Sequence, residues 1–190
     1  MNMNTELKKV ASRYAQAEKQ KRELRDISSK LQKVSKQIIF SLHRGKNEEA
    51  SRQSGEAQGL MKEGLALIKK EKLIEDEGAW RAAVEEMLEA DLFLNAVNGK
   101  EILELKYKPE DPLIMIGALS DLIGELVRYS VFCATNKNRQ EIVRVSKLAD
   151  KVFEMLLSLD ATGYARTKVD QARQHIRKLE EIKYDLSFDI

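Results

Sequence analysis

Apolar residues recur every seven positions through the first forty residues of this chain. Ala17, Leu24, Leu31 and Ile38 form the repeat. A seven-residue apolar repeat is typical of a long helix that packs against other helices in a bundle or a coiled coil. We therefore expect one long helix from about residue 5 to residue 44, ended by Gly45.

The rest of the chain also has the apolar spacing of helices. Residues 100–108 fit either a short helix or an extended piece, and residues 75–78 are expected to be a connection. The only two prolines fall in one break, where Asp111 is expected to cap a helix that begins at Pro112. The sequence predicts an all-α bundle of six to seven helices, with residues 1–190 as a single domain. The further helices are expected over about 47–72, 79–97, 112–135, 138–159 and 164–185.

Positive charge is concentrated near the N-terminus. Residues 1–46 hold twelve Lys or Arg and four acids, a net charge of +8, which leaves −6 for the rest of a chain whose total is +2. A basic arm on a mildly acidic body indicates a polyanionic partner. A solvated helix face is the alternative interpretation.

The most apolar stretch of the chain, residues 112–134, contains two carboxylates four residues apart, Asp121 and Glu125. As a helix this stretch is hydrophobic nearly all round, so we expect it to be buried with both carboxylates on one face. It is long enough to cross a bilayer, but its acids and Arg128 indicate a core helix and no membrane association. Buried carboxylates need compensation, and both a hard cation such as Mg²⁺ and a salt bridge to Arg128 or another cation remain open.

A second acidic pair, Glu86 and Glu89, lies three residues apart on the preceding helix. If the two helices pack side by side, the four acids could form a cluster that one or two Mg²⁺ or Mn²⁺ ions would neutralise. Ions held in this way can activate water for phosphodiester cleavage. A solvated face is the alternative for Glu86 and Glu89. Iron is disfavoured because neither histidine belongs to a Glu-x-x-His motif, and His43 is expected to be exposed at a helix end.

The single cysteine, Cys133, excludes an intramolecular disulfide and a cysteine-based metal site. We expect it to pack in the core of the 112–134 helix. Together with polar first residues that do not resemble a signal peptide, this indicates a reducing, cytoplasmic setting.

Three segments of the chain are similar to motifs of the translin family, in particular to its translin-associated factor X branch. They are IIFSLHR at 38–44, LSDLIGELVRY at 119–129 and KLEEIKYDLS at 178–187. The resemblance implies an all-α fold of about seven helices and a hollow oligomer, typically an octamer. It also implies binding of single-stranded or structured RNA and of DNA.

In the factor X branch, the resemblance also implies a Mg²⁺-dependent endoribonuclease site with four acids. Those positions are Glu86 and Glu89 in an E-x-x-E motif and Asp121 and Glu125 in D-L-x-G-E, and all four are acids here. The resemblance therefore favours the catalytic branch as a self-sufficient homo-oligomer, with a second translin-like subunit left open.

Three hypotheses about function follow. The first is a Mg²⁺-dependent endoribonuclease whose basic first helix holds the RNA backbone through phosphate contacts. The second is a nucleic-acid-binding protein without catalysis, whose acids are paired internally. The third is a helical scaffold for protein partners. The candidate phosphate contacts, several of which could instead keep the helix soluble or cross an interface, are Arg13, Lys21, Arg22, Arg25 and Lys33.

Overall fold

The computed structural model describes residues 3–70 and 78–188, with side chains as far as residue 185. This part of the chain contains six helices and no strand, so the all-α prediction is confirmed. The end of the expected second helix at 71–72, and all but the last residue of the expected connection at 75–78, lie outside the described residues. The helices are α1 Met3–Leu42, α2 Asn47–Lys70, α3 Gly78–Val97, α4 Pro112–Thr135, α5 Arg139–Leu157 and α6 Gly163–Phe188.

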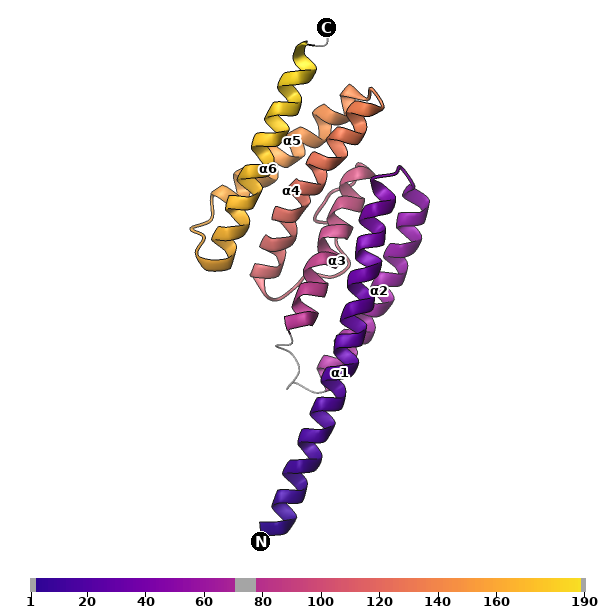
Figure 1. The fold of residues 1–190 in the computed structure, drawn as a ribbon, viewed down its shortest axis with the longest axis vertical. Helices are drawn as coiled ribbons and strands as arrows, with labels where there is room; N and C mark the ends of the chain where they lie inside the picture. Colours follow the sequence, from indigo (N-terminus) through magenta and orange to yellow (C-terminus); the bar gives the residue numbers. More distant parts are fainter. Residues whose placement is uncertain (1–2, 71–77, 189–190) are drawn as a thin grey trace.

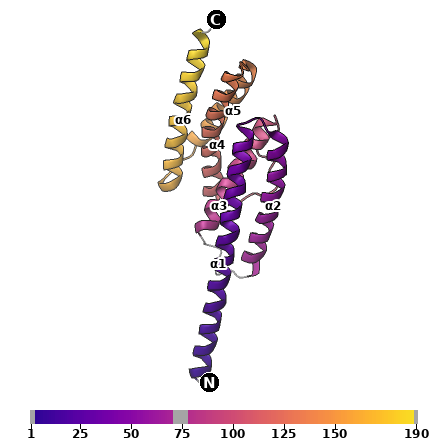
Figure 2. The same ribbon diagram turned by 45° about the vertical axis from the view of Figure 1, so that its right-hand side comes forward.

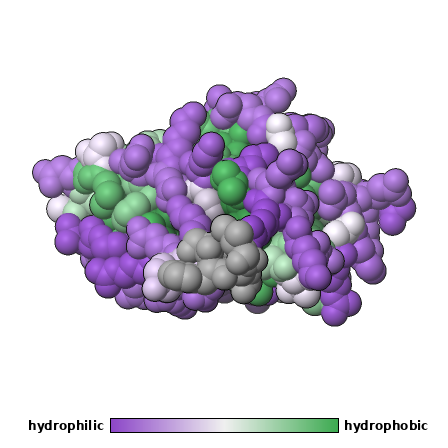
Figure 3. Space-filling view, turned by 90° about the horizontal axis from the view of Figure 1, so that it is seen from above, coloured by the Kyte–Doolittle hydropathy of each residue, from purple (hydrophilic) through white to green (hydrophobic). Residues whose placement is uncertain are grey.

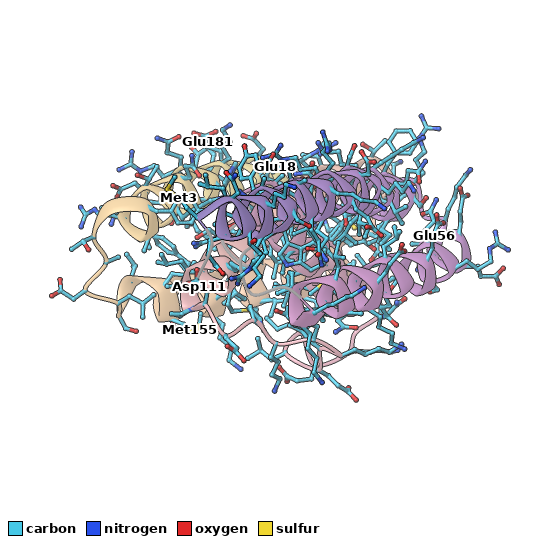
Figure 4. All side chains as sticks on the ribbon, turned by 90° about the horizontal axis from the view of Figure 1, so that it is seen from below. Met3, Glu18, Glu56, Asp111, Met155 and Glu181 are labelled. Atoms are coloured by element: carbon cyan, nitrogen blue, oxygen red, sulfur yellow. The ribbon has the colours of Figure 1, made fainter. Side chains whose placement is uncertain are left out.

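The helices form two groups that meet at α3 and α4. Helices α1, α2 and α3 pack together on one side, and α4, α5 and α6 on the other, with α3 against α4 between them (Figure 1). The first turns of α1 extend beyond the other helices, and the two termini lie at opposite ends of the molecule (Figures 1 and 2). Seen from the N-terminal end, the labelled Met3 and Glu18 lie on this long helix and Asp111 lies at the start of α4 (Figure 4).

All six helices contribute side chains to one hydrophobic core. The repeat residues Leu24, Leu31 and Ile38 are fully buried in it. Each such side chain stabilises the fold by roughly 1.5–3 kcal/mol relative to exposure. Eleven of the 24 residues of α4 are buried, and Cys133 is one of them, as expected. Within the described part of the chain, no helix is both long and apolar enough to cross a membrane. Seen from above, the exterior is mostly hydrophilic with small hydrophobic areas (Figure 3).

The ends of the helices follow the expected local chemistry. The Asp111 side chain accepts a hydrogen bond of 2.9 Å from the backbone N–H of Leu113, with Pro112 at the first helical position. Gly45 follows α1 with a φ of +70°, a conformation that glycine adopts without strain. Residues 100–108 do not form the seventh helix, because the Asn95 amide of α3 donates to the carbonyl oxygen of Glu104 at 3.1 Å and holds this segment as an irregular connection.

Close packing of α2 against α3 depends on a glycine. A Cβ atom at Gly64 would lie 2.2 Å from two ring carbons of Trp80, so the indole occupies the space that any larger residue would need. At Gly59, one helical turn and a half earlier, a Cβ atom would meet nothing within 4 Å. Of the glycines in α2, only Gly64 is therefore required by packing.

Candidate acidic site between α3 and α4

A glycine in α4 leaves space for an acid of α3 where the two helices pack side by side. A Cβ atom at Gly117 would lie 2.3 Å from the carboxyl carbon of Glu85. Four residues later, Asp121 projects from the same face of α4. The close contact at Gly117 therefore brings the acidic faces of the two helices together.

The four acids predicted from the sequence line one continuous region. Glu86, Glu89 and Asp121 line a cavity of about 520 Å³, and Glu86, Glu89 and Glu125 line a neighbouring cavity of about 300 Å³. Because the two cavities share Glu86 and Glu89, the side chains of both acidic pairs face the same region. The alternative of a solvated face is wrong for Glu86 and Glu89: the Glu86 side chain is only 19% exposed, and Glu89 is also partly buried.

Glu89 is the acid whose charge the protein compensates least. The described residues give it no hydrogen-bond donor and no ion-pair partner. Burial, followed by repulsion from Asp121, Glu125 and Glu86, raises the pKa of Glu89 to about 8, and Lys168 opposes this only weakly. The protonated, neutral form of Glu89 is therefore favoured, and Glu89 is the member of the cluster without a cation beside it.

Asp121 is paired with a lysine of α6. The Lys168 ammonium lies 2.5 Å from Asp121 and 2.9 Å from Glu85, and Tyr164 also donates a hydrogen bond to Glu85 at 2.5 Å. Burial raises the pKa of Asp121, although the bond from Lys168 opposes the shift. Burial lowers the pKa of Lys168, but its hydrogen bonds to Asp121 and Glu85 outweigh that effect and raise the pKa above its usual value. Helix α6 thus places a firmly charged cation against the acidic cluster.

Two side chains contact the Glu125 carboxylate. His43, just after α1, contacts the Glu125 carboxylate, and Arg128 lies 3.2 Å from it. Burial would raise the pKa of Glu125, but His43 and Arg128 together lower it below its usual range. The expectation that His43 is exposed is wrong, because its side chain is only 11% exposed and its ring lies 5.0 Å from that of Phe93.

Glu86 has one exposed partner. Lys36 of α1 lies 3.4 Å from Glu86, and the lysine side chain is 70% exposed. Burial raises the pKa of Glu86, and Lys36 opposes that shift. Such an exposed ion pair contributes little stability, so Lys36 can leave Glu86 and bind another anion at low cost.

The oxygen atoms of this cluster suit a hard divalent cation, but the side chains are not arranged around one. Carboxylates are ordinary ligands of Mg²⁺ and Mn²⁺. In residues 3–70 and 78–185, however, no three His, Cys, Asp or Glu side chains converge as a metal-binding set. A metal ion would have to displace the side chains that now contact the acids, above all Lys168 from Asp121 and His43 from Glu125.

Several neighbours of the acids were not predicted from the sequence. They include Glu85, Tyr164, Lys168 and His175, whose Nε2 would lie 3.1 Å from a Cβ atom at Gly124. Burial lowers the pKa of His175, and so does Lys178, against the opposing charges of the acids. Only Glu85 had a sequence signal, since it adjoins Glu86. The other three come from α6, and their contacts depend on how that helix packs.

The five predicted phosphate contacts all lie on α1 but not on one face. Arg22, Arg25 and Lys33 are exposed and lie along one side of the helix. Lys21 is partly buried and lies 3.7 Å from Glu18, and Arg13, nine residues before Arg22, lies on the opposite side. The structure thus places three of the five predicted phosphate contacts, Arg22, Arg25 and Lys33, on one side of α1.

The fold and the site define a class of protein: an all-α bundle with a carboxylate cluster between its two central helices and a long basic helix beside it. The sequence model of the Translin family matches residues 86–188, more than half of the chain. This chain belongs to the translin family.

Solved structures of the same fold include a complex of AfC3PO with duplex RNA. That protein is 22% identical, with a TM-score of 0.85 over 93% of this chain and 94% of that one. Another structure of AfC3PO is 22% identical, with a TM-score of 0.85 over 97% and 98% of the two chains. Apo-NeC3PO is 23% identical, with a TM-score of 0.79 over 96% of each. No curated protein gives a significant match.

Proposed function

We propose that this protein is a Mg²⁺-dependent endoribonuclease that acts on single-stranded or structured RNA. The observation that carries the proposal is Glu89, a partly buried acid with a pKa of about 8 and no partner of opposite charge among the described residues. Glu86, Asp121 and Glu125 repel negative charge on Glu89, and a cation that joins the four acids during function would relieve that repulsion. The RNA duplex bound in the AfC3PO structure supports RNA as the polyanion.

Two groups of residues would have separate roles, one in binding the metal and one in binding the RNA. Glu86, Glu89, Asp121 and Glu125 would hold the metal, which when bound supplies an activated water and neutralises developing charge on the phosphate. Mn²⁺ could take the same oxygen ligands. Basic residues of α1 would hold the RNA backbone without reading its sequence.

We further propose that the protein works as a hollow homo-oligomer, typically an octamer in this family, with a second translin-like subunit as the alternative. Single-stranded DNA would bind to the same basic surface, since phosphates supply most of the contact. A cytoplasmic location suits the free, buried thiol of Cys133.

The test is the substitution Glu125→Gln. It should abolish Mg²⁺-dependent cleavage of a labelled single-stranded RNA and leave binding within a few-fold, because the amide keeps the shape but not the charge. Asp91→Asn is the control: Asp91 is a buried acid of α3 that accepts a hydrogen bond from Ser54 of α2, on the side of α3 away from the acidic cluster. Cleavage that persists in the Glu125 variant would exclude Glu125 as a metal ligand.

A binding protein without catalysis is the second candidate. The observation that favours it is the pairing of Asp121 with Lys168 and of Glu125 with His43, which compensates half of the cluster without a metal. This candidate predicts RNA binding that weakens steeply with salt, and no cleavage after addition of Mg²⁺ or Mn²⁺.

A further inference from the structure

An aromatic ring is exposed beside the acidic cluster. Phe40, in the last turn of α1, is 55% exposed, although large apolar side chains of this helix are otherwise buried from Leu24 onward. The Arg44 guanidinium lies 4.1 Å from the centre of the ring, a cation–π contact that fixes the ring and covers part of it. The remaining ring surface faces solvent.

Phe40 connects the acidic cluster to the basic side of α1. It lines the cavity of about 300 Å³ that also contains Glu86, Glu89 and Glu125. It also lines a third cavity, of about 520 Å³, on the outer side of α1 beside Lys33. Lys36 lines both cavities as well. A ligand lying along α1 would therefore pass over Phe40 and Lys36 to reach the acids.

The basic residues that lead to Phe40 lie along one side of α1. Arg22, Arg25, Lys33, Lys36 and Phe40 are separated by three, eight, three and four residues, which keeps them on one face of a helix. The face is about 27 Å long from Arg22 to Phe40, at 1.5 Å per residue. Four basic residues and one exposed acid, Asp26, lie on this side of the helix, so its net charge is positive and its ligand is an anion that extends along the helix.

We infer that Phe40 is a platform on which an unpaired base of bound RNA stacks, with Lys36 and Arg44 as contacts for the phosphates on either side of that base. Exposed aromatic rings between cations are how proteins bind single strands, because every base has a flat face and every nucleotide a phosphate. A paired base is already stacked within its duplex and cannot lie on the ring. The site thus selects RNA that is single-stranded at the position nearest the acids.

This inference rests on the proposed action on RNA but not on cleavage, so it is tested without metal. A single-stranded RNA that carries the fluorescent base 2-aminopurine is titrated with full-length protein in the presence of a chelator. Stacking on Phe40 should quench the fluorescence. Phe40→Ala should remove the quenching and weaken binding about tenfold, within the range measured for loss of one base–aromatic stack. Phe40→Trp should retain both.

Val143→Ala is the control, because Val143 is an apolar residue of α5 with 54% exposure and lines neither of the two cavities that contain Phe40. It should behave as the unaltered protein does. Binding of a blunt RNA duplex should depend much less on Phe40 than binding of the single strand.

Two results would overturn the inference. One is quenching and affinity in Phe40→Ala that equal those of the unaltered protein. The other is a change in particle size by light scattering in Phe40→Ala, which would assign the exposed ring to contacts between copies of the chain. Quenching that depends on Phe40 without any Mg²⁺-dependent cleavage would uphold the stacking site and refute the nuclease. Mg²⁺-dependent cleavage that does not depend on Phe40 would uphold the nuclease and refute the stacking site.

Discussion

Replacing Glu89 with glutamine should stabilise this protein at alkaline pH. A carboxyl whose pKa is raised on folding binds its proton more tightly in the folded state than in the unfolded state. Between the unfolded value of 4.5 and the folded value of about 8, the free energy of unfolding therefore falls as the pH rises. Glutamine cannot ionise, so the variant avoids this loss.

The size of this stabilisation follows from the shift in the pKa of Glu89. At 1.36 kcal/mol per pH unit, the move from 4.5 to about 8 sets an upper bound of about 5 kcal/mol above pH 8. Glu89 keeps some contact with water, and its neighbours relax, so we expect a gain of about 1–3 kcal/mol for Glu89→Gln at pH 8. At pH 4 the two proteins should unfold alike, because both carry a neutral side chain there.

The assay is urea denaturation of both proteins at pH 4, 6 and 8 in a chelator, at one protein concentration. Glu63→Gln, at an exposed position of α2, is the control and should show no such dependence on pH. Adding Mg²⁺ should stabilise the unaltered protein more at pH 8 than at pH 6, since the metal competes with the proton on Glu89. A difference between Glu89→Gln and the unaltered protein that stays constant from pH 4 to pH 8 would refute the reasoning.

Two further predictions concern packing and charge. Lys168→Met should destabilise the protein by about 1–3 kcal/mol, because it leaves Asp121 without its cation. A double-mutant cycle with Asp121→Asn, measured by urea denaturation, should show coupling between the two residues. Additive effects of the two substitutions would mean that the pair contributes nothing to stability. Gly64→Ala should destabilise by about 1–3 kcal/mol because its methyl group would overlap the Trp80 ring, whereas Gly59→Ala should stabilise by about 0.5–1 kcal/mol through helix propensity alone. Equal thermal melting temperatures of the two alanine variants would contradict this account of α2.

The helices were predictable because the signals that form them are local. The repeat of Leu24, Leu31 and Ile38 identified the buried side of α1, and Asp111 with Pro112 identified the start of α4. The spacing of the acids also predicted which side chains share a face of α3 or α4. What the spacing left open was whether the two faces meet, and packing at Gly117 settles that.

The partners of the acids were not predictable, because they are distant in the sequence. His43 and Glu125 are separated by 82 residues, and Asp121 and Lys168 by 47. Nothing in the local pattern around Lys168 distinguishes it from the other lysines of an amphipathic helix. The sequence left a metal and an internal salt bridge as alternatives, and the structure adds that the salt bridges compensate Asp121 and Glu125 but not Glu89.

The most direct test of a divalent ion between α3 and α4 is diffraction from crystals soaked in Mn²⁺, whose anomalous signal locates the metal. We predict a peak within coordination distance, about 2.0–2.3 Å, of oxygen atoms from both helices, including Glu89. Lys168 should then have moved away from Asp121. A Mn²⁺-soaked crystal without a peak there, and with Lys168 still bound to Asp121, would contradict the proposed metal site.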